Sequence, residues 1–218
     1  MTMARTFHLR LPVDAEAIRE LRLGDLVTVD GDIVATGGLP THNRIIEAID
    51  GKRELPFPLD GAAFFHLPSY SRDTDEGMEI VYINPTTSTR FNPIMPRIIR
   101  HFGLRIVCGK GGLDAECARA MREVGCVYLS ILGGGATLHT DAIRGVLDVG
   151  WPDLVTHYRL ARLRVEGLGP LTVAIDAHGN NGYLQLEDQA RARLPGIMED
   201  LRKARESAAS DHGDSAKT

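Results

Sequence analysis

An alternation of apolar runs and amphipathic runs between Met78 and about Val149 most constrains what this chain can fold into. Three runs are expected to be strands, and each is followed by a turn rich in glycine or proline and then by a helical pattern. The strands are predicted at residues 78–83, 104–108 and 126–131, and the helices after Arg90, from Asp114 and from about Thr137. This alternation predicts an α/β fold with a parallel sheet and crossover helices. Binding sites in such sheets gather at the carboxyl ends of the strands, so we expect a site in these turns.

The first of these turns carries hydroxyl groups and an arginine. Residues 84–90 have the sequence NPTTSTR. Pro85 ends the preceding strand because it has no backbone N–H to offer to the ladder. Thr86 and Thr87 then lie before a helix N-terminus, where free backbone N–H groups and the helix dipole favour an anion. Arg90 could bind a carboxylate through both nitrogens of its guanidinium.

The second turn, residues 109–112, has the sequence GKGG and carries Lys110. Together the two turns would bring hydroxyls, a guanidinium and an ammonium to one edge of the sheet, which predicts a pocket for a small carboxylate. Each turn also has a structural interpretation, because Pro-Thr-Thr-Ser is a good helix N-cap and Gly-Lys-Gly-Gly an ordinary turn. Their pairing in consecutive strand–turn–helix units favours a functional site.

The part of the chain before residue 78 is predicted to be rich in strands. Two β-branched runs within residues 23–36 flank Asp30-Gly31, which predicts a hairpin with a type I′ turn. Pro40 lies in the first turn of a predicted helix that contains His42. A histidine at a helix end is commonly a capping or surface group, although the neighbouring glycines would let a ligand approach the backbone. Residues 62–67 are a predicted short strand, and residues 69–77 a mobile polar loop.

The final third is predicted to return to strands and then to end in a helix. Strands are expected at residues 158–165 and 171–176, and residues 188–208 have helical periodicity interrupted by Pro195. Residues 209–218 are small and polar and are expected to be disordered. We therefore predict one domain of layered β/β/α architecture over residues 1–208.

Composition and cysteine usage exclude several classes of protein. A net charge of −4 argues against a nucleic-acid binder, and no apolar run is long enough to predict a membrane span. With three cysteines and no signal-peptide pattern, we expect reduced thiols and a cytoplasmic location. Three thiolates can hold an iron–sulfur cluster, but Cys108 and Cys126 lie in predicted strands and Cys117 in a predicted helix. We therefore predict no metal site on this chain, and the histidines show no zinc-ligand spacing.

Several motifs, in their order and spacing, resemble the β subunit of iron–sulfur-dependent fumarate and L-tartrate dehydratases and the C-terminal domain of single-chain class I fumarases. They are LGDLV at 23–27, Thr36 with His42 and Arg44, PTTSTR at 85–90, GKGG at 109–112, and GPL at 169–171 with IDAHGNN at 175–181. The resemblance covers residues 5–185. It implies a swivelling β/β/α domain that pairs with an α subunit, which would hold a [4Fe–4S] cluster through three cysteines of its own. One iron would bind the substrate and the leaving hydroxyl.

The resemblance implies a hydro-lyase acting on a small dicarboxylate of the fumarate/malate or L-tartrate type, active with its α subunit. It implies catalytic roles for Thr86, Lys110 and His42 and substrate binding by Arg90, Thr87, Arg44 and Gly111. Thr86 matches the hydroxyl implicated in proton transfer beside a carboxylate, and Lys110 matches the active-site lysine. Arg90 matches the arginine that clamps a substrate carboxylate, and His42 matches the histidine of the first glycine-turn motif.

One departure from the family pattern leaves the substrate open. Family members usually carry Arg-Asp shortly before the histidine, where residues 37–40 of this chain are GGLP, and the Glu expected near Tyr158 is absent. Either Arg44 or Arg72 replaces the missing arginine, or a paralogue with the same fold acts on another carboxylate. A non-catalytic subunit that binds an anion is the third alternative. A homodimer also stays open beside the pairing with an α subunit.

Overall fold

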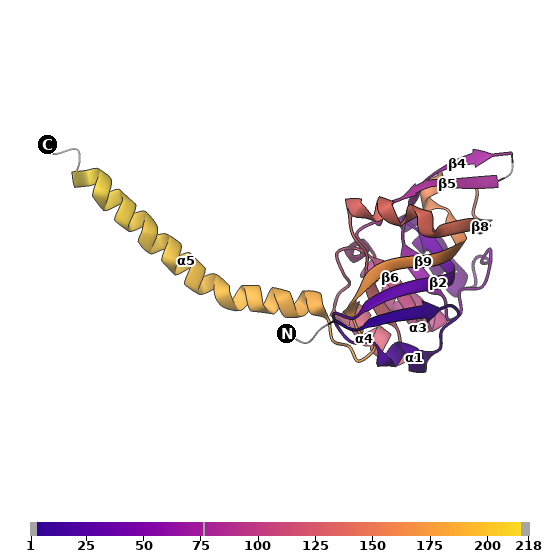
Figure 1. Cartoon of the computed structure of the whole chain (residues 1–218), viewed down its shortest axis with the longest axis horizontal. Helices are drawn as coiled ribbons and strands as arrows, with labels where there is room; N and C mark the ends of the chain where they lie inside the picture. The colour runs from indigo at the N-terminus through magenta and orange to yellow at the C-terminus, as the bar shows by residue number, and fades with distance from the viewer. Residues whose placement is uncertain (1–3, 76, 215–218) are drawn as a thin grey trace. The chain divides into compact units, whose positions relative to one another are not determined.

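The computed structural model describes residues 4–75 and 77–214, with side chains through Glu206. The chain divides into two compact units, Met1–Asn181 and Gly182–Thr218, which are described separately (Figure 1). Among the described residues, no helix combines the length and the apolar character needed to span a bilayer.

The first unit is built on a seven-stranded sheet in the order β1-β2-β3-β6-β7-β9-β8. Five neighbouring strands are parallel: β1 (Thr6–Arg10), β2 (Leu26–Thr36), β3 (Ala63–His66), β6 (Ile106–Gly109) and β7 (Val127–Ser130). The long strand β9 (Leu160–Ile175) runs antiparallel to β7, to β8 (Ile143–Gly150) and also to β2. Because β9 pairs with both β2 and β7, the hydrogen-bonded strands β2, β3, β6, β7 and β9 form a closed circuit.

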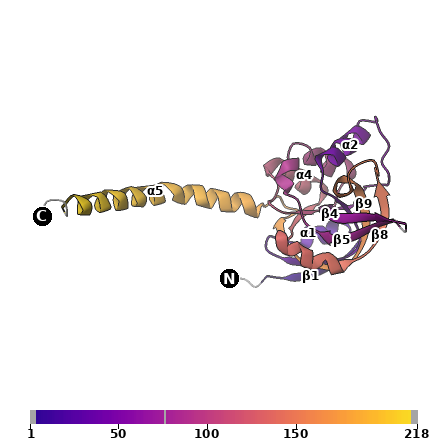
Figure 2. The ribbon, with the colours of Figure 1, turned by 90° about the horizontal axis from the view of Figure 1, so that it is seen from above.

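Helices connect the parallel strands, which confirms the predicted α/β class. They are α1 (Ala15–Glu20), α2 (Leu39–Ile49), α3 (Met95–Phe102) and α4 (Ala115–Val124). The start and end of α4 follow from its sequence, because the Asp114 side chain accepts a hydrogen bond from the Cys117 N–H and Gly125 ends the helix with φ +73°. Seen from above, α2 and α4 lie together on one side of the labelled strands (Figure 2).

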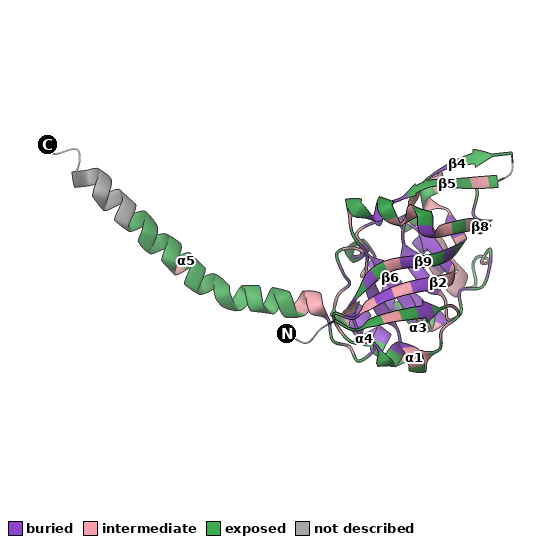
Figure 3. Cartoon of the chain, in the orientation of Figure 1, coloured by how far each residue is buried: buried purple, intermediate pink, exposed green. Residues whose placement is uncertain are grey.

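Burial concentrates in the strands of the sheet and in the helix faces that pack on them (Figure 3). All four residues of β3 and all four of β6 are buried. Parallel strands covered on both faces have this pattern of continuous apolar residues. The site described below lies at the carboxyl ends of these two strands.

The predicted hairpin within residues 23–36 is wrong. The segment forms the single strand β2, whose two halves pair with β9 instead of with each other. Gly31 lies at a register shift with φ +115°, and a Cβ there would lie 2.9 Å from the Leu11 carbonyl oxygen. The glycine therefore marks a bulge where another part of the backbone approaches closely.

The predicted position of residues 78–83 in the parallel sheet is also wrong. They belong to β5 (Gly77–Ile83), which pairs antiparallel with β4 (Ser69–Thr74) in a separate two-stranded sheet. Residues 69–74 are therefore a strand where a loop was expected. Only Ile83 is fully buried in β5, so β5 cannot fill a central position, and the fully buried β3 pairs with β6 instead.

The structure also differs from the predictions after residue 133. A 3-10 helix, η2 (Gly134–Ala142), is followed by β8, where an α-helix from about Thr137 was predicted. The β-branched residues Ile143, Val146 and Val149 suit a strand, and β9 supplies its partner. The two strands predicted at 158–165 and 171–176 are one strand, β9, of 16 residues.

The second unit consists of α5 (Gly182–Asp214), which contains Pro195. It starts before the predicted helix 188–208 and extends into the range 209–218, for which disorder was predicted; residues 215–218 lie outside the described residues. Ion pairs three or four residues apart stabilise its surface, among them Glu187–Arg191 and Glu199–Arg202.

Candidate functional site

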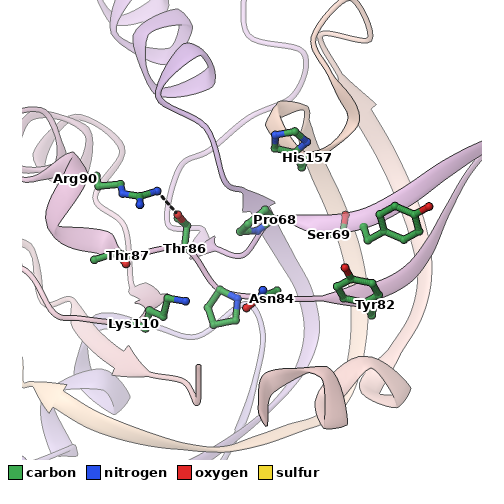
Figure 4. A pocket seen from close by; sticks show the side chains of 11 residues that line it. Pro68, Ser69, Tyr82, Asn84, Thr86, Thr87, Arg90, Lys110 and His157 are labelled. Atoms are coloured by element: carbon green, nitrogen blue, oxygen red, sulfur yellow. Dashed lines mark hydrogen bonds between the residues drawn. The ribbon is translucent and has the colours of Figure 1, made fainter. Parts of the chain in front are cut away.

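An open pocket of about 380 Å³ lies beside the carboxyl ends of β3 and β6 (Figure 4). Its lining comes from the start of β4, the end of β5, the turn after β5, the 3-10 helices η1 (Ser88–Phe91) and η3 (Thr156–Tyr158), and the turn after β6. The lining residues are Pro68, Ser69, Tyr70, Tyr82, Asn84, Pro85, Thr86, Thr87, Arg90, Lys110 and His157.

The two turns predicted to meet are joined by backbone hydrogen bonds. The Ser88 N–H donates to the Lys110 carbonyl (2.8 Å), and the Lys110 N–H donates to the Thr86 carbonyl (3.4 Å). The Thr86 N–H donates to the carbonyl of His66 at the end of β3 (3.0 Å). Thr87 and Lys110 form an isolated parallel bridge. The hydroxyls and the ammonium therefore enter the pocket from neighbouring backbone segments whose positions are set by hydrogen bonds.

Four of the predicted site residues, Thr86, Thr87, Arg90 and Lys110, share this pocket. The Arg90 Nη1 donates a hydrogen bond to the Thr86 Oγ1 at 3.4 Å (Figure 4). Thr86 is buried at its base, 9% exposed, whereas Arg90 is exposed. No acidic side chain is among the described residues that line the pocket, so its two cations favour an anion.

Gly111 does not line the pocket but supports it. It adopts φ +81°, and a Cβ there would lie 3.0 Å from the Thr87 Cγ2. Glycine at this position therefore lets the turn that carries Lys110 lie against Thr87.

Behind the pocket lies a chain of buried hydrogen bonds that the sequence analysis missed. The Ser88 hydroxyl bonds the His66 Nδ1 at 2.8 Å and the Tyr128 hydroxyl at 2.9 Å, and the Gly112 N–H donates to the Tyr128 hydroxyl. Ser88 lies beside Gly109, where any Cβ would collide with its hydroxyl oxygen. The hydroxyl-rich turn after β5 therefore fits closely against the glycines at the end of β6 and in the turn that follows it.

His42 does not line the pocket. It is fully buried in α2, stacks on Phe91 with a ring separation of 3.8 Å, and places its Nδ1 2.7 Å from the Gly38 carbonyl oxygen. Its Nε2 is buried and has no hydrogen-bond partner among the described residues. Burial lowers the pKa of His42 to about 4, and burial likewise lowers the pKa of His66 well below its usual value. Both rings are therefore neutral at neutral pH.

This burial predicts a pH dependence of folding. The unfolded chain protonates His42 near pH 6.5, but the folded chain does so only near pH 4, so stability falls as the pH drops from 6.5 toward 4. At pH 5 this effect of His42 lowers the free energy of unfolding by roughly 2 kcal/mol relative to neutral pH. A His42→Phe variant should lose less thermal stability between pH 7 and pH 5 than the parent chain. The exposed His101 provides the control, because His101→Phe should leave that difference unchanged; equal slopes for all three proteins would contradict the prediction.

The two arginines considered as replacements for the missing one point elsewhere. Arg44 donates to both carboxylate oxygens of Asp153, at 2.8 and 2.5 Å, and Arg72 is paired with Glu79 at 2.5 and 3.1 Å. Neither lines the pocket. A side chain at position 38 would collide with the ring of Tyr158, which fills that space.

The far side of the pocket consists of residues that the sequence analysis did not single out. Tyr70 and Tyr82 stack with ring centroids 5.3 Å apart, and His157 and Ser69 complete this side. Ser69 and Tyr70 were not identified as site residues because residues 69–77 were predicted to be a mobile loop. The available signal for them was Gly77, a turn residue between residues 69–74 and the apolar run 78–83, because two strands joined by a short glycine-containing loop form a hairpin.

The cysteines of this chain do not suit a cluster. Cys108, Cys117 and Cys126 are all buried, and burial raises the pKa of each thiol. The described residues contain no group of three or more His, Cys, Asp or Glu side chains that could hold a metal ion. The donors among the described residues therefore do not fit a [4Fe–4S] cluster.

Comparison with known proteins places these features in context. The family model of the fumarase C-terminus matches residues 2–186. The L(+)-tartrate dehydratase subunit beta of Escherichia coli (strain K12) is 30% identical over 193 residues, which cover 88% of this chain and 94% of that protein. A protein of Geobacillus stearothermophilus named "Putative fumarate hydratase class I" is 31% identical over 201 residues, which cover 89% of this chain. The match spans only 37% of the length of that second relative.

Proposed function

Because the chain belongs to the fumarase C-terminus family, we propose that it is the β subunit of a hydro-lyase that reversibly hydrates and dehydrates a small dicarboxylate. Substrates of the fumarate/malate or L-tartrate type fit this proposal. The observation that carries it is the meeting of Thr86, Arg90 and Lys110 in one open pocket, with no acidic side chain among the described residues that line it. A relative of nearly the same length, named as a tartrate dehydratase subunit beta, supports it.

In this proposal Thr86 moves the proton and the two cations bind the acid. In the dehydration direction, the ionised Thr86 oxygen takes the proton from the carbon beside a carboxylate, a C=C bond forms, and hydroxide leaves the neighbouring carbon. The hydroxide then takes up the proton from Thr86 and departs as water, which returns Thr86 to its ionised form. Loss of the proton places a second negative charge on the carboxylate group, and Arg90 and Lys110 stabilise that charge. A threonine is a weak base, but nearby cations favour its ionised form, and Arg90 already donates to its oxygen.

The proposal includes a partner. The [4Fe–4S] cluster is assigned to an α subunit, since the buried thiols of this chain do not suit it, and turnover then requires both subunits. A swivelling β/β/α domain and a cytoplasmic location belong to the same proposal. The mixed sheet with covering helices supports the first of these.

One observation favours a second candidate, a paralogue that acts on a different carboxylate. Arg44 and Arg72 are paired with Asp153 and Glu79, and the Tyr158 ring fills the space beside Gly38. A second substrate carboxylate would therefore lack an arginine from these positions. Loss of one charged contact of this kind costs on the order of 2–5 kcal/mol, which is enough to change substrate choice.

The test is anaerobic co-expression with the α subunit, followed by turnover assays with fumarate, L-malate, L-tartrate and a monocarboxylic hydroxy acid. We expect turnover of a dicarboxylate by the complex and none by the isolated chain. Turnover of the monocarboxylic acid alone would establish the second candidate. A complex with an intact cluster that binds these acids by calorimetry but turns over none of them would make this chain a non-catalytic anion-binding subunit and refute the proposal.

A further inference from the structure

Helix α5 carries a row of exposed apolar side chains along one side. Leu194, Ile197, Met198 and Leu201 are each about half exposed, between 49% and 57%. Residues three and four apart lie on the same side of a helix. From residue 190 to residue 204 the spacing alternates between four and three, through Ala190, Leu194, Ile197, Leu201 and Ala204. This is the heptad spacing of a helix that packs along its length against another helix.

Helix α5 needs another apolar surface packed against this row in order to be stable. Pro195 and Gly196 lie inside the helix, and in a helix interior they cost about 3 and 1 kcal/mol relative to alanine. In proteins, most of the stability of a helix comes from packing its apolar face. The helix is a unit of its own, and the family match ends at residue 186, near its start. The surface that packs against the apolar row is therefore expected to be specific to chains that carry α5.

We propose that the apolar row of α5 packs against the same row of a second copy of this chain, with the two helices antiparallel. In the register that brings Leu194 against Ile197 of the second copy, Ala190 faces Leu201. Small side chains then meet large ones and the layers fill evenly. A parallel pair would instead place Ala190 against its own copy and leave a gap in that layer.

The charges beside the row agree with this arrangement. Arg193 and Asp200 flank the row, and neither has an ion-pair partner within the described residues, whereas Glu187–Arg191 and Glu199–Arg202 are paired along the helix. In the antiparallel register, Arg193 lies beside Asp200 of the second copy, and the two-fold axis produces this pair twice. In a parallel pair, Asp200 would lie beside Arg205 instead.

The mass of the full chain in solution, measured by sedimentation equilibrium, tests the packing. We expect a dimer whose dissociation constant rises by about a hundredfold or more in an Ile197→Lys variant, because a charge would enter the centre of the interface. Ala192→Lys places the same side chain on the opposite face of α5 and should leave the dissociation constant unchanged. A monomeric parent chain would overturn the proposal, as would a dimer that Ile197→Lys does not weaken.

A charge exchange tests the direction of the helices. Asp200→Arg should weaken the dimer by about tenfold, and the double variant Arg193→Asp/Asp200→Arg should restore the parent value. Failure of the double variant to restore it would overturn the antiparallel arrangement, because in a parallel pair Arg205 would still repel the new arginine. These experiments measure only the mass of the protein in solution, so their outcome does not depend on the proposed hydro-lyase activity.

Discussion

Replacing Thr86 by valine is expected to lower kcat of the proposed hydro-lyase complex by about 10²- to 10⁴-fold, the usual contribution of a positioned acid–base group. Valine has nearly the shape of threonine but no hydroxyl, so the variant removes the proton acceptor and keeps the packing. The Thr86 backbone is held by the hydrogen bond from its N–H to the His66 carbonyl, and the substitution leaves that bond in place. The measurement is steady-state turnover of the complex with the proposed α subunit.

The matched control for this prediction is Thr86→Ser, which keeps the hydroxyl. It should retain turnover within about tenfold of the parent enzyme, since only the methyl group is lost. KM should change less than kcat in Thr86→Val, because Arg90 and Lys110, to which the proposal assigns carboxylate binding, are unchanged. Full turnover by Thr86→Val would remove Thr86 from the mechanism.

Gly109→Ala is expected to have the largest effect on folding, with a loss of roughly 3–5 kcal/mol in the free energy of unfolding. The new Cβ would collide with the Ser88 hydroxyl and would lie 3.1 Å from the His66 Cβ. Ser88 cannot move away without breaking its buried hydrogen bonds to His66 and Tyr128. The unfolding free energy from urea denaturation measures this loss.

Gly145→Ala is the matched control, because this glycine also lies in a strand and a Cβ there meets nothing within 4 Å. We expect it to change stability by less than about 1 kcal/mol. A second check is the pair Gly109→Ala/Ser88→Ala, which removes the colliding oxygen. Its loss should be smaller than the sum of the two single losses, since the sites are coupled. Additive losses would show that the collision is not the cause.

Much of the fold could be predicted from local signals in the sequence. Pro40 and Pro96 lie in the first turns of α2 and α3, Asp114 caps α4, and Gly103 and Gly125 end helices in the left-handed conformation. These residues act within one turn of backbone, so their effect is visible without the rest of the molecule.

Strand partners could not be predicted in the same way. Asp30-Gly31 predicted a hairpin, but β9, more than a hundred residues later, pairs with both halves of β2. Likewise, the apolar run 78–83 is a strand, yet β3 is the strand that pairs with β6. Pairing depends on which distant strand offers a buried face, and a local pattern does not contain that information.

The pocket, too, could be predicted where its residues follow from local signals and not where they depend on tertiary packing. Thr86, Thr87, Arg90 and Lys110 were identified from two turns whose chemistry is local, and the structure brings them together. His157 and Tyr82 escaped notice because they reach the pocket from η3 and β5, through tertiary packing. His42 has the sequence context of a site residue, but its ring is packed on Phe91 in the core.

The contact between Gly38 and Tyr158 limits which substitutions this chain can accept. As long as the Tyr158 ring fills that space, no single substitution at position 38 can add a side chain without a clash. Two substitutions are required: a smaller residue has to replace Tyr158 before position 38 can carry a side chain. A charged side chain at position 38 therefore requires a second substitution, at position 158, to make room for it.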